Sequence, residues 1–562
     1  MRAGVGLVRC LKAEGVTWVG TFPSSPVNEV IADEGVRHVM AREERTAVAI
    51  ADGYSRVSNG KCFGVATCMG GINAAGIQMA YGALAQAYED SSPMLCITGG
   101  AETANWQLSR YDIQRGLESV TKWNAYINRA DRVPEFMRRA YTYLKTGHPA
   151  PVLIQIPADL VGQEYDDTVN TYTPVKGWKY AGDQRDVEVA VRTILAAKNP
   201  LIYAGQGIFY ADACGELKEF AELVQAPVLS TLHGKSVFPE NHPLSVGVRG
   251  IPASYFLDTA DLIFGVATSL NKGRFSHIIP NAAQKIIVQT AIDEFDVNKN
   301  YRVDHAMIGD AKLVLRQMIE DVKKQAGSGG RSRNEALEEK IRSLKEEQYE
   351  TLKEALTSSQ TPMNPYRVYW DIMHTIDRDN SIITHESGNT RDQLSTIWES
   401  TSPHGYIGWG NVSTLGFGYG AALGAKLAYP NRTVVNFCGD ASIGYFTGDL
   451  EVGIREKIPI ITVHINNNGF GGYGPGFWGK GGHPSTSTVT PSTIYSSAKV
   501  AEGMGLYSER VEKPDEVSPA FRRAMKTTAS GKAALLEMIC IQYPIYGMWG
   551  RATGASPAIR AE

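Results

Sequence analysis

Two short polar motifs, each following a run of largely apolar residues, constrain this chain most. Gly-Asp-Ala-Ser at 439–442 follows the apolar run 433–438, and three asparagines at 466–468 follow the run 459–465. Short apolar runs that end in turn residues are typical of buried parallel strands. The carboxyl ends of such strands share one edge of an open α/β sheet, and ligands bind at that edge. We therefore expect an acid and several amides to lie together at a ligand-binding edge.

The chemistry and spacing of these motifs favour a cation site. Asn467 lies 27 residues after Asp440, which leaves room for a crossover helix within 447–457 and a second strand. Carboxylate and amide oxygens are the hard ligands that Mg²⁺ prefers, usually together with phosphate oxygens. Taken alone, the first motif favours an ordinary strand–turn–helix unit that has a capping Asp.

Length and composition exclude several classes of protein. A chain of 562 residues is too long for one core and predicts about three domains. The net charge of −3 gives no basic field for nucleic acid, and no apolar run reaches the roughly 20 residues that span a bilayer. The N-terminus lacks a signal-peptide pattern, and the seven cysteines are scattered without zinc-site spacing. These features predict a cytoplasmic protein that binds neither nucleic acid nor membrane.

Alternating strand-like and helix-like segments predict an α/β protein with three doubly wound parallel-sheet domains. We expect a first domain over 1–165, a middle domain over 187–325 and a third over 360–545, followed by a tail over 546–562. The charged stretch 334–353 predicts a solvated connecting helix. The predicted strands are 18–22, 63–67, 94–97, 151–156, 200–204, 227–230, 261–266, 381–384, 433–438, 460–465 and 534–539.

The paired motifs resemble the diphosphate-binding motif of thiamine diphosphate (ThDP) enzymes, and the layout resembles their pyruvate oxidase/acetolactate synthase branch. In that branch a pyrimidine-binding (PYR) domain, a middle domain and a diphosphate-binding (PP) domain follow in this order. The resemblance implies ThDP and Mg²⁺ as cofactors, with Asp440, Asn467 and the carbonyl of Gly469 as metal ligands. Ala441 stands where the family has Gly, a mild departure, and the cofactor-binding turn comprises Gly439, Asp440, Ala441 and Ser442.

Glu44 is the predicted catalytic carboxylate. It precedes an Ala-rich stretch that ends in Asp52-Gly53-Tyr54, as in this family, where a glutamate contacts the aminopyrimidine ring and thereby activates the cofactor. A dry pocket would raise the pKa of such a carboxylate. The alternative is an ordinary acid in a first helical turn, which is our interpretation of the neighbouring Glu43.

Further positions follow from the same resemblance. Leu415 stands where relatives place the apolar residue that bends the cofactor, although a core leucine is the default interpretation. The stretch 386–390 resembles one in 2-hydroxyacyl-CoA lyases and oxalyl-CoA decarboxylases, so Gly388 and Asn389 are candidates to approach the diphosphate. An Asn-containing loop turn explains that stretch equally well. In the middle domain, 205–207 and 248–250 sit at strand ends that receive FAD or ADP in some relatives, but we expect structural turns and no FAD.

The residues expected to face the substrate differ from those of acetolactate synthases. Asn73 is a candidate pocket residue, and the Gly/aromatic stretch after the asparagines offers Phe470, Tyr473, Phe477 and Trp478 as apolar walls. Residues 108–110 replace a Phe-Gln-Glu run of acetolactate synthases, so we expect a different substrate wall. The tail is a candidate lid, or a segment that docks on another subunit.

These observations predict a ThDP- and Mg²⁺-dependent lyase, decarboxylase or carboligase that breaks or makes a C–C bond beside a carbonyl. Its substrate would be a 2-oxo acid, an aldehyde or an acyl-CoA. The resemblance implies a homodimer or homotetramer with active sites at the subunit interface. The alternatives are a flavin-assisted enzyme of the pyruvate oxidase type and a ThDP-fold protein that binds without turnover.

Overall fold

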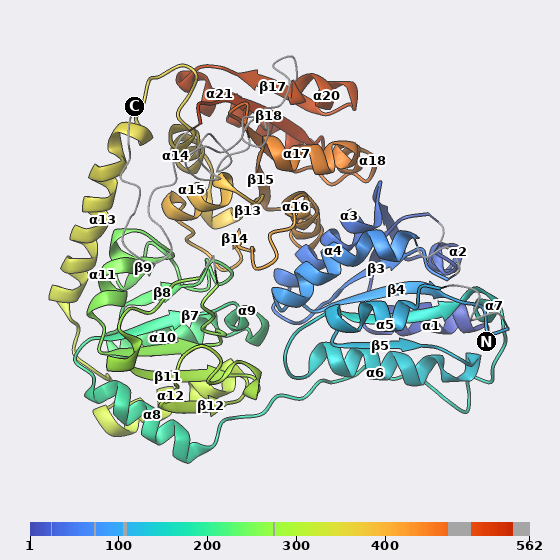
Figure 1. Ribbon diagram of the computed structural model, residues 1–562, viewed down its shortest axis with the longest axis horizontal. Helices are drawn as coiled ribbons and strands as arrows, with labels where there is room; N and C mark the ends of the chain where they lie inside the picture. Colours follow the sequence, from blue (N-terminus) through green and yellow to red (C-terminus); the bar gives the residue numbers. More distant parts are fainter. Residues whose placement is uncertain (24, 72–74, 105–109, 274–275, 470–495, 543–562) are drawn as a thin grey trace.

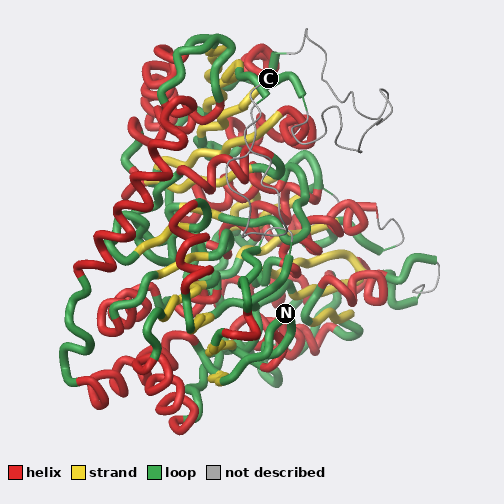
Figure 2. The backbone as a smooth tube through the Cα atoms, turned by 60° about the vertical axis from the view of Figure 1, so that its left-hand side comes forward, coloured by secondary structure: helices red, strands yellow, loops and turns green. Residues whose placement is uncertain are grey.

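The computed structural model contains three α/β domains, each built on a six-stranded parallel sheet (Figure 1). It describes residues 1–23, 25–71, 75–104, 110–273, 276–469 and 496–542. Strands lie inside the domains and helices surround them (Figure 2). Sequence analysis therefore predicted the fold class correctly, while the exact domain boundaries remain predictions.

The first sheet has the order β2-β1-β3-β4-β6-β5. Every residue of β3, β4 and β6 is buried, because helices cover both faces of the sheet. The strands are β1 (Trp18–Thr21), β2 (Arg37–Met40), β3 (Gly64–Cys68), β4 (Met94–Gly100), β5 (Trp123–Tyr126) and β6 (Val152–Pro157). The helices are α1 (Ala3–Ala13), α2 (Asn28–Asp33), α3 (Glu44–Arg56), α4 (Ala75–Glu89), α5 (Ile113–Leu117), α6 (Val133–Lys145) and α7 (Ala158–Val161).

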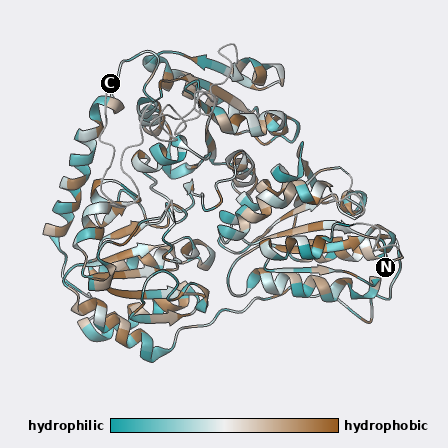
Figure 3. Ribbon diagram, viewed as in Figure 1, coloured by the Kyte–Doolittle hydropathy of each residue, from teal (hydrophilic) through white to brown (hydrophobic). Residues whose placement is uncertain are grey.

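The second sheet has the order β12-β11-β10-β7-β8-β9. Its strands are β7 (Pro200–Ala204), β8 (Val228–Ser230), β9 (Ser245–Gly247), β10 (Leu262–Val266), β11 (Ile286–Ala291) and β12 (His305–Ile308). Its helices are α8 (Gln184–Ala196), α9 (Gly207–Ala211), α10 (Cys214–Val224), α11 (Ile251–Thr259) and α12 (Ala311–Ala326). The long, mostly hydrophilic helix α13 (Glu335–Leu356) then runs along the molecule to the third domain, as expected for a connecting helix (Figures 1 and 3).

The third sheet has the order β14-β13-β15-β16-β18-β17, so the strands that end in the two polar motifs are neighbours. Its strands are β13 (Ser381–His385), β14 (Tyr406–Ile407), β15 (Thr433–Gly439), β16 (Ile461–Asn466), β17 (Tyr507–Val511) and β18 (Ala534–Ile539). Its helical segments are α14 (Pro365–Thr375), α15 (Asn389–Ile397), α16 (Phe417–Ala428), α17 (Asp440–Phe446), the 3₁₀ turn η6 (Thr447–Glu451), α18 (Val452–Arg455), α20 (Ser497–Gly503) and α21 (Pro514–Ala529). The predicted crossover helix therefore begins earlier than expected, at Asp440 itself.

Helix α3 of the first domain packs directly on helix α16 of the third domain (Figure 1). Glycines make this close approach possible. A Cβ atom on Gly53 would collide with the backbone of Ala421, and one on Gly424 would collide with the carbonyl oxygen of Ile50. The close packing of α3 on α16 thus depends on glycine, which has no side chain, at the helix crossing.

Gly53→Ala is expected to lower the free energy of unfolding by about 1–3 kcal/mol, the usual cost of overpacking a tight contact. The matched control is Gly215→Ala in α10, where a Cβ meets no atom within 4 Å. Alanine is favoured over glycine in a helix, so the control protein should melt at the same temperature or higher. Thermal unfolding measures both, and equal melting temperatures for the two variants would contradict the predicted steric role.

A buried carboxylate, Asp90, joins all three domains. It accepts hydrogen bonds from Arg56 at 3.0 Å, from His233 of the middle domain at 2.8 Å, and from the backbone N–H of Asn411 at 3.2 Å. Burial alone would raise the pKa of Asp90, but His233 and Arg56 lower it to about 2. Asn411 lies four residues before Leu415. The charge network around Asp90 therefore holds in place the segment that leads from Asn411 to Leu415.

Candidate functional site

Asp440 lies at the first turn of α17, immediately after β15, and is buried. Its Oδ2 atom accepts hydrogen bonds from the backbone N–H groups of Asn467 at 3.1 Å and Gly469 at 3.4 Å. A Cβ atom at position 469 would meet the end of the Gln542 side chain, which would have to move. The two polar motifs thus meet at one edge of the third sheet.

Two oxygen atoms at this edge have unmet bonding capacity. Asp440 Oδ1 and Asn467 Oδ1 are both buried, and neither makes a hydrogen bond within the part of the chain that the structure describes. Buried polar atoms without hydrogen bonds are energetically unfavourable and rare, and a bound ion is one way to satisfy them. A carboxylate oxygen and an amide oxygen are suitable ligands for a divalent cation. These residues therefore fit the metal expected here.

Neighbouring residues shape the turn around the acid. Ser442 Oγ accepts a hydrogen bond from the N–H of Gly439 at 3.1 Å and so closes the first turn of α17. Ala441, between Asp440 and Ser442, is partly buried. These contacts fix the backbone from which Asp440 projects.

Gly388 and Asn389 follow β13, the strand next to β15, and so lie along the same sheet edge. Gly388 has a φ of +97°, and a Cβ there would meet no atom within 4 Å. Asn389 begins α15. The backbone at this turn is therefore open to a ligand at the edge that carries Asp440.

Glu386 lies in the stretch 386–390, but no role was predicted for it from the sequence. The side chain is fully buried, and its carboxylate accepts the backbone N–H groups of Gly416 at 2.9 Å and Tyr419 at 3.0 Å. Glu386 therefore caps α16 and fixes the backbone next to Leu415. Burial raises its pKa to about 8, although the N–H donors partly oppose this shift.

This raised pKa predicts a pH-dependent stability. Folded Glu386 stays protonated at pH values where the unfolded chain has released the proton, so its stabilising contribution is complete below about pH 4.5 and is lost as pH rises through about 8. The Glu386→Gln variant has no side chain at position 386 that can release a proton. The melting temperature of the wild type minus that of the variant should therefore fall between pH 5 and 9. A difference that is constant over this range would contradict the assignment.

Glu44 is the first residue of α3, and its side chain is buried, with a relative exposure of 4%. Burial raises its pKa, as expected for a carboxylate that shares a proton. Glu43 differs: it is the N-cap residue of α3, just before the first helical turn in which it was expected, and its partly exposed side chain forms an ion pair with Arg45. Leu415 is half-buried and directly precedes Gly416, the N-cap of α16.

The N-terminus of α3 contacts the segment that follows Asp440. Arg45 donates to the carbonyl of Tyr445 at 2.9 Å, and Asp449 accepts from the N–H of Arg42 at 2.7 Å and the hydroxyl of Thr46 at 2.8 Å. The start of α3 in the first domain therefore contacts the segment from Tyr445 to Asp449 of the third domain within a single chain. This contact within one chain was not predicted from the sequence. An active site at the interface between subunits remains a prediction.

Several predicted substrate-side residues lie outside the described ranges. They are Asn73, Phe470, Tyr473, Phe477, Trp478 and the tail over 546–562. Residue 110 is described, but residues 108 and 109 of the altered substrate wall are not.

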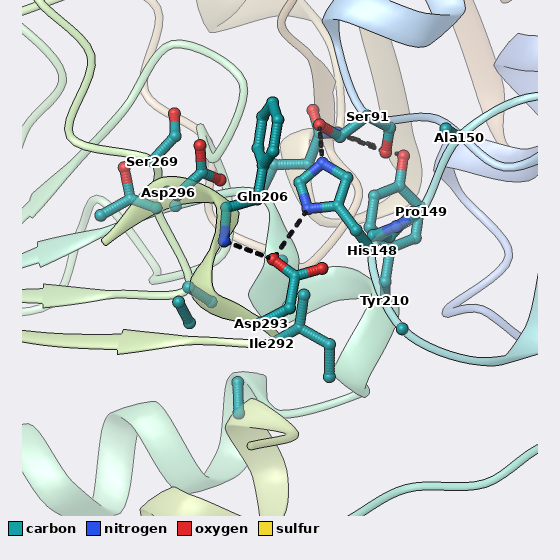
Figure 4. Close-up of a pocket in the computed structure, with 18 of the residues that line it drawn as sticks. Ser91, His148, Pro149, Ala150, Gln206, Tyr210, Ser269, Ile292, Asp293 and Asp296 are labelled. Atoms are coloured by element: carbon teal, nitrogen blue, oxygen red, sulfur yellow. Dashed lines mark hydrogen bonds and ion pairs between the residues drawn. The ribbon is translucent and has the colours of Figure 1, made fainter. Parts of the chain in front are cut away.

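The middle domain has a cavity of about 570 Å³ where its strands end and the first domain meets it. Gly205, Gln206 and Gly207, which we interpreted as a structural turn, line this cavity. The ring of His148 lies between Ser91, at 2.9 Å, and Asp293, at 4.0 Å (Figure 4). The second stretch considered for nucleotide binding, 248–250, has a structural role, because buried Arg249 forms an ion pair with Asp392 of the third domain.

Comparison with known proteins agrees with this architecture. Three family models match the chain in order: "Thiamine pyrophosphate enzyme, N-terminal TPP binding domain" over residues 1–121, "central domain" over 187–318 and "C-terminal TPP binding domain" over 386–538.

No helix within the described ranges has the length and apolar character to cross a membrane.

Similar proteins extend over nearly the whole chain. A probable acetolactate synthase large subunit of Methanococcus aeolicus is 28% identical over 93% of this chain and 90% of its own length. A glyoxylate carboligase of Escherichia coli O157:H7 is 27% identical over 96% of this chain and 93% of its own. Acetolactate synthase isozyme 3 large subunit of Escherichia coli K12 is 24% identical over 95% of this chain and 93% of its own. With three domains matched in order and relatives of this kind along its length, the chain belongs to the thiamine pyrophosphate-dependent enzymes.

Proposed function

We propose that this enzyme breaks or makes a C–C bond next to a carbonyl group, with ThDP held through a divalent cation, Mg²⁺ in the first instance. The observation that carries the proposal is the pair of buried oxygens without hydrogen bonds in the described residues, Asp440 Oδ1 and Asn467 Oδ1, at the sheet edge that also carries the open turn at Gly388. Bound ThDP supplies a nucleophilic carbon that adds to the carbonyl of a 2-oxo acid, an aldehyde or an acyl-CoA.

The residues of the chain have separate roles in this proposal. Asp440, Asn467 and the carbonyl of Gly469 hold the cation, and the backbone at 388–389 and 439–442 holds the diphosphate. Glu44, whose pKa is raised by burial, would hold a proton against the pyrimidine ring. Leu415, fixed by the capped start of α16, supports the rings. The site lies between PYR and PP domains, in a homodimer or homotetramer.

The substrate class is tested by supplying the purified chain with ThDP and Mg²⁺ and a panel of 2-oxo acids, aldehydes and acyl-CoAs. Release of CO₂ or formation of a new C–C bond that requires added ThDP supports the proposal. The names of the relatives favour carboligation of 2-oxo acids such as pyruvate or glyoxylate as the first reactions to assay. ThDP-independent turnover, or none across the panel, would contradict it.

The middle-domain cavity favours a second candidate, the flavin-assisted version of this enzyme, since Gly205 and Gly207 line a space at the strand ends of an α/β sheet. The visible absorption spectrum of the purified protein decides between the two. A flavin band that survives desalting supports the second candidate, and a colourless active protein rejects it.

A further inference from the structure

Asp449 is a buried acid of the third domain that contacts the start of α3 in the first domain. It lies in η6, and its relative exposure is 2%. Its Oδ1 atom accepts a hydrogen bond from the backbone N–H of Arg42 at 2.7 Å, and its Oδ2 atom accepts one from the hydroxyl of Thr46 at 2.8 Å. Both oxygens of one side chain therefore bind the same short segment of another domain.

These two contacts lie on either side of the predicted catalytic residue, Glu44. Arg42 precedes Glu44 by two residues, and Thr46 follows it by two. One buried side chain therefore fixes the backbone both before and after Glu44. The side chain of Glu44 is confined as well, because its Oε1 atom packs against Gly76 of α4, where a Cβ atom would displace it.

The N-cap residue of α3 does not anchor the start of this helix. The first backbone N–H groups of an α-helix have no partners within the helix, and the N-cap side chain usually accepts one of them. Glu43 occupies the N-cap position of α3 but makes no such hydrogen bond, and its side chain pairs with Arg45 instead. The contacts with Asp449 therefore supply an anchor that the helix lacks from its own cap.

Asp449 is also the buried part of a longer contact between the two domains. Glu451, in the same 3₁₀ turn, pairs with the side chain of Arg42, which is 63% exposed. The helical run that contains Asp449 begins at Asp440, since η6 follows α17 directly. One short segment of the third domain thus carries the proposed cation ligand at its start and the anchor of the Glu44 segment near its end.

We propose that Asp449 is a positioning residue for Glu44. By holding Arg42 and Thr46, it determines where the Glu44 carboxylate lies relative to the cofactor. This inference rests on the proposed function in taking Glu44 as the group that holds a proton at the cofactor. A displacement of about 1 Å, caused by a substitution away from the chemistry, is enough to lower turnover about 10²-fold.

The first test is a double-mutant cycle in the full-length protein. Asp449→Ala removes both acceptors and should lower kcat by about 10–100-fold with little change in KM, because it displaces Glu44 without removing a substrate contact. In the Glu44→Gln background the same substitution should cause little further loss, because residues that act as a unit are not additive. Asp449→Asn keeps one acceptor oxygen and should recover part of the activity. Equal fold-losses in the two backgrounds would overturn the proposal, because a merely structural residue acts independently of Glu44.

Glu451→Ala is the matched control. It removes another acid of η6, one that binds the exposed side chain of Arg42 and not its backbone. Ion pairs that solvent reaches contribute little to stability, so this variant should keep the wild-type kcat. A loss equal to that of Asp449→Ala would count against the proposal, because any weakening of the domain contact would then have the same effect.

Hydrogen exchange measures the contact without ThDP and without turnover. The N–H of Arg42 donates to Asp449, so amide exchange in a peptide that covers 40–48 should be faster in Asp449→Ala than in the wild type. Exchange in Glu451→Ala should match the wild type. Unchanged exchange in Asp449→Ala would reject Asp449 as the anchor.

Thr46→Val covers the case in which Asp449→Ala does not fold, because it removes only the hydroxyl that Asp449 accepts. It should lower kcat in the wild-type background and not in the Glu44→Gln background. An active wild type with an additive cycle would reject the positioning role alone. A folded wild type without ThDP-dependent turnover would reject the proposed function and the positioning role together.

Discussion

Glu44→Gln is expected to reduce ThDP-dependent turnover by about 10²–10⁴-fold, the usual contribution of one acid–base group. Glutamine keeps the shape of the side chain but cannot exchange a proton. Because burial already raises the pKa of Glu44, its neutral replacement should not destabilise the fold. Turnover at saturating ThDP and Mg²⁺, together with the melting temperature of the same preparation, measures both expectations.

Glu43→Gln is the matched control for this experiment. It removes an adjacent, partly exposed acid that pairs with Arg45. Ion pairs that solvent reaches contribute about 0–1 kcal/mol, so this variant should keep both turnover and stability near wild type. Full activity in Glu44→Gln, or equal losses in both variants, would show that position 44 has no special chemical role.

Asp440→Asn should weaken the binding of the divalent cation by more than about 100-fold, beyond the 10–100-fold typical of losing an outer-shell partner. The variant removes the negative charge at the site. It also places an amide where two backbone N–H groups, those of Asn467 and Gly469, need an acceptor. Cation-dependent ThDP binding by calorimetry should fall in parallel.

Asp449→Asn provides the comparison. Asp449 is another buried acid of the third domain, and burial raises its pKa to about 6. It accepts hydrogen bonds from Arg42 and Thr46 of the first domain, so its replacement should affect the stability of the domain contact rather than cation binding. Cation affinities that fall equally in the two variants would mean that Asp440 acts through the fold and not as a ligand.

The strands that sequence patterns predicted are the interior ones. Runs such as 94–97 and 433–438 became β4 and β15, because a strand covered on both faces is apolar along most of its length. The edge strands β2, β5, β9, β12, β14 and β17 were all missed. Each of these is short or half-exposed, and β17 (Tyr507–Val511) carries charges, so no apolar run marks it. The interior strand β11 was also missed.

Sequence patterns were sufficient to predict the fold class and that Asp440 and Asn467 follow two neighbouring strands, because apolar runs mark buried strands and turn residues mark their ends. Glu44 was located through the family resemblance, and the roles of all three residues stay predictions. Three other features arise only when distant segments pack together. The helix crossing at Gly53, the raised pKa of Glu386 and the contact of Asp449 with the start of α3 all join residues that are far apart in the chain. Their common physical cause is burial: a packed interior excludes water, and only then does an unpaired acceptor or an added methyl group become costly.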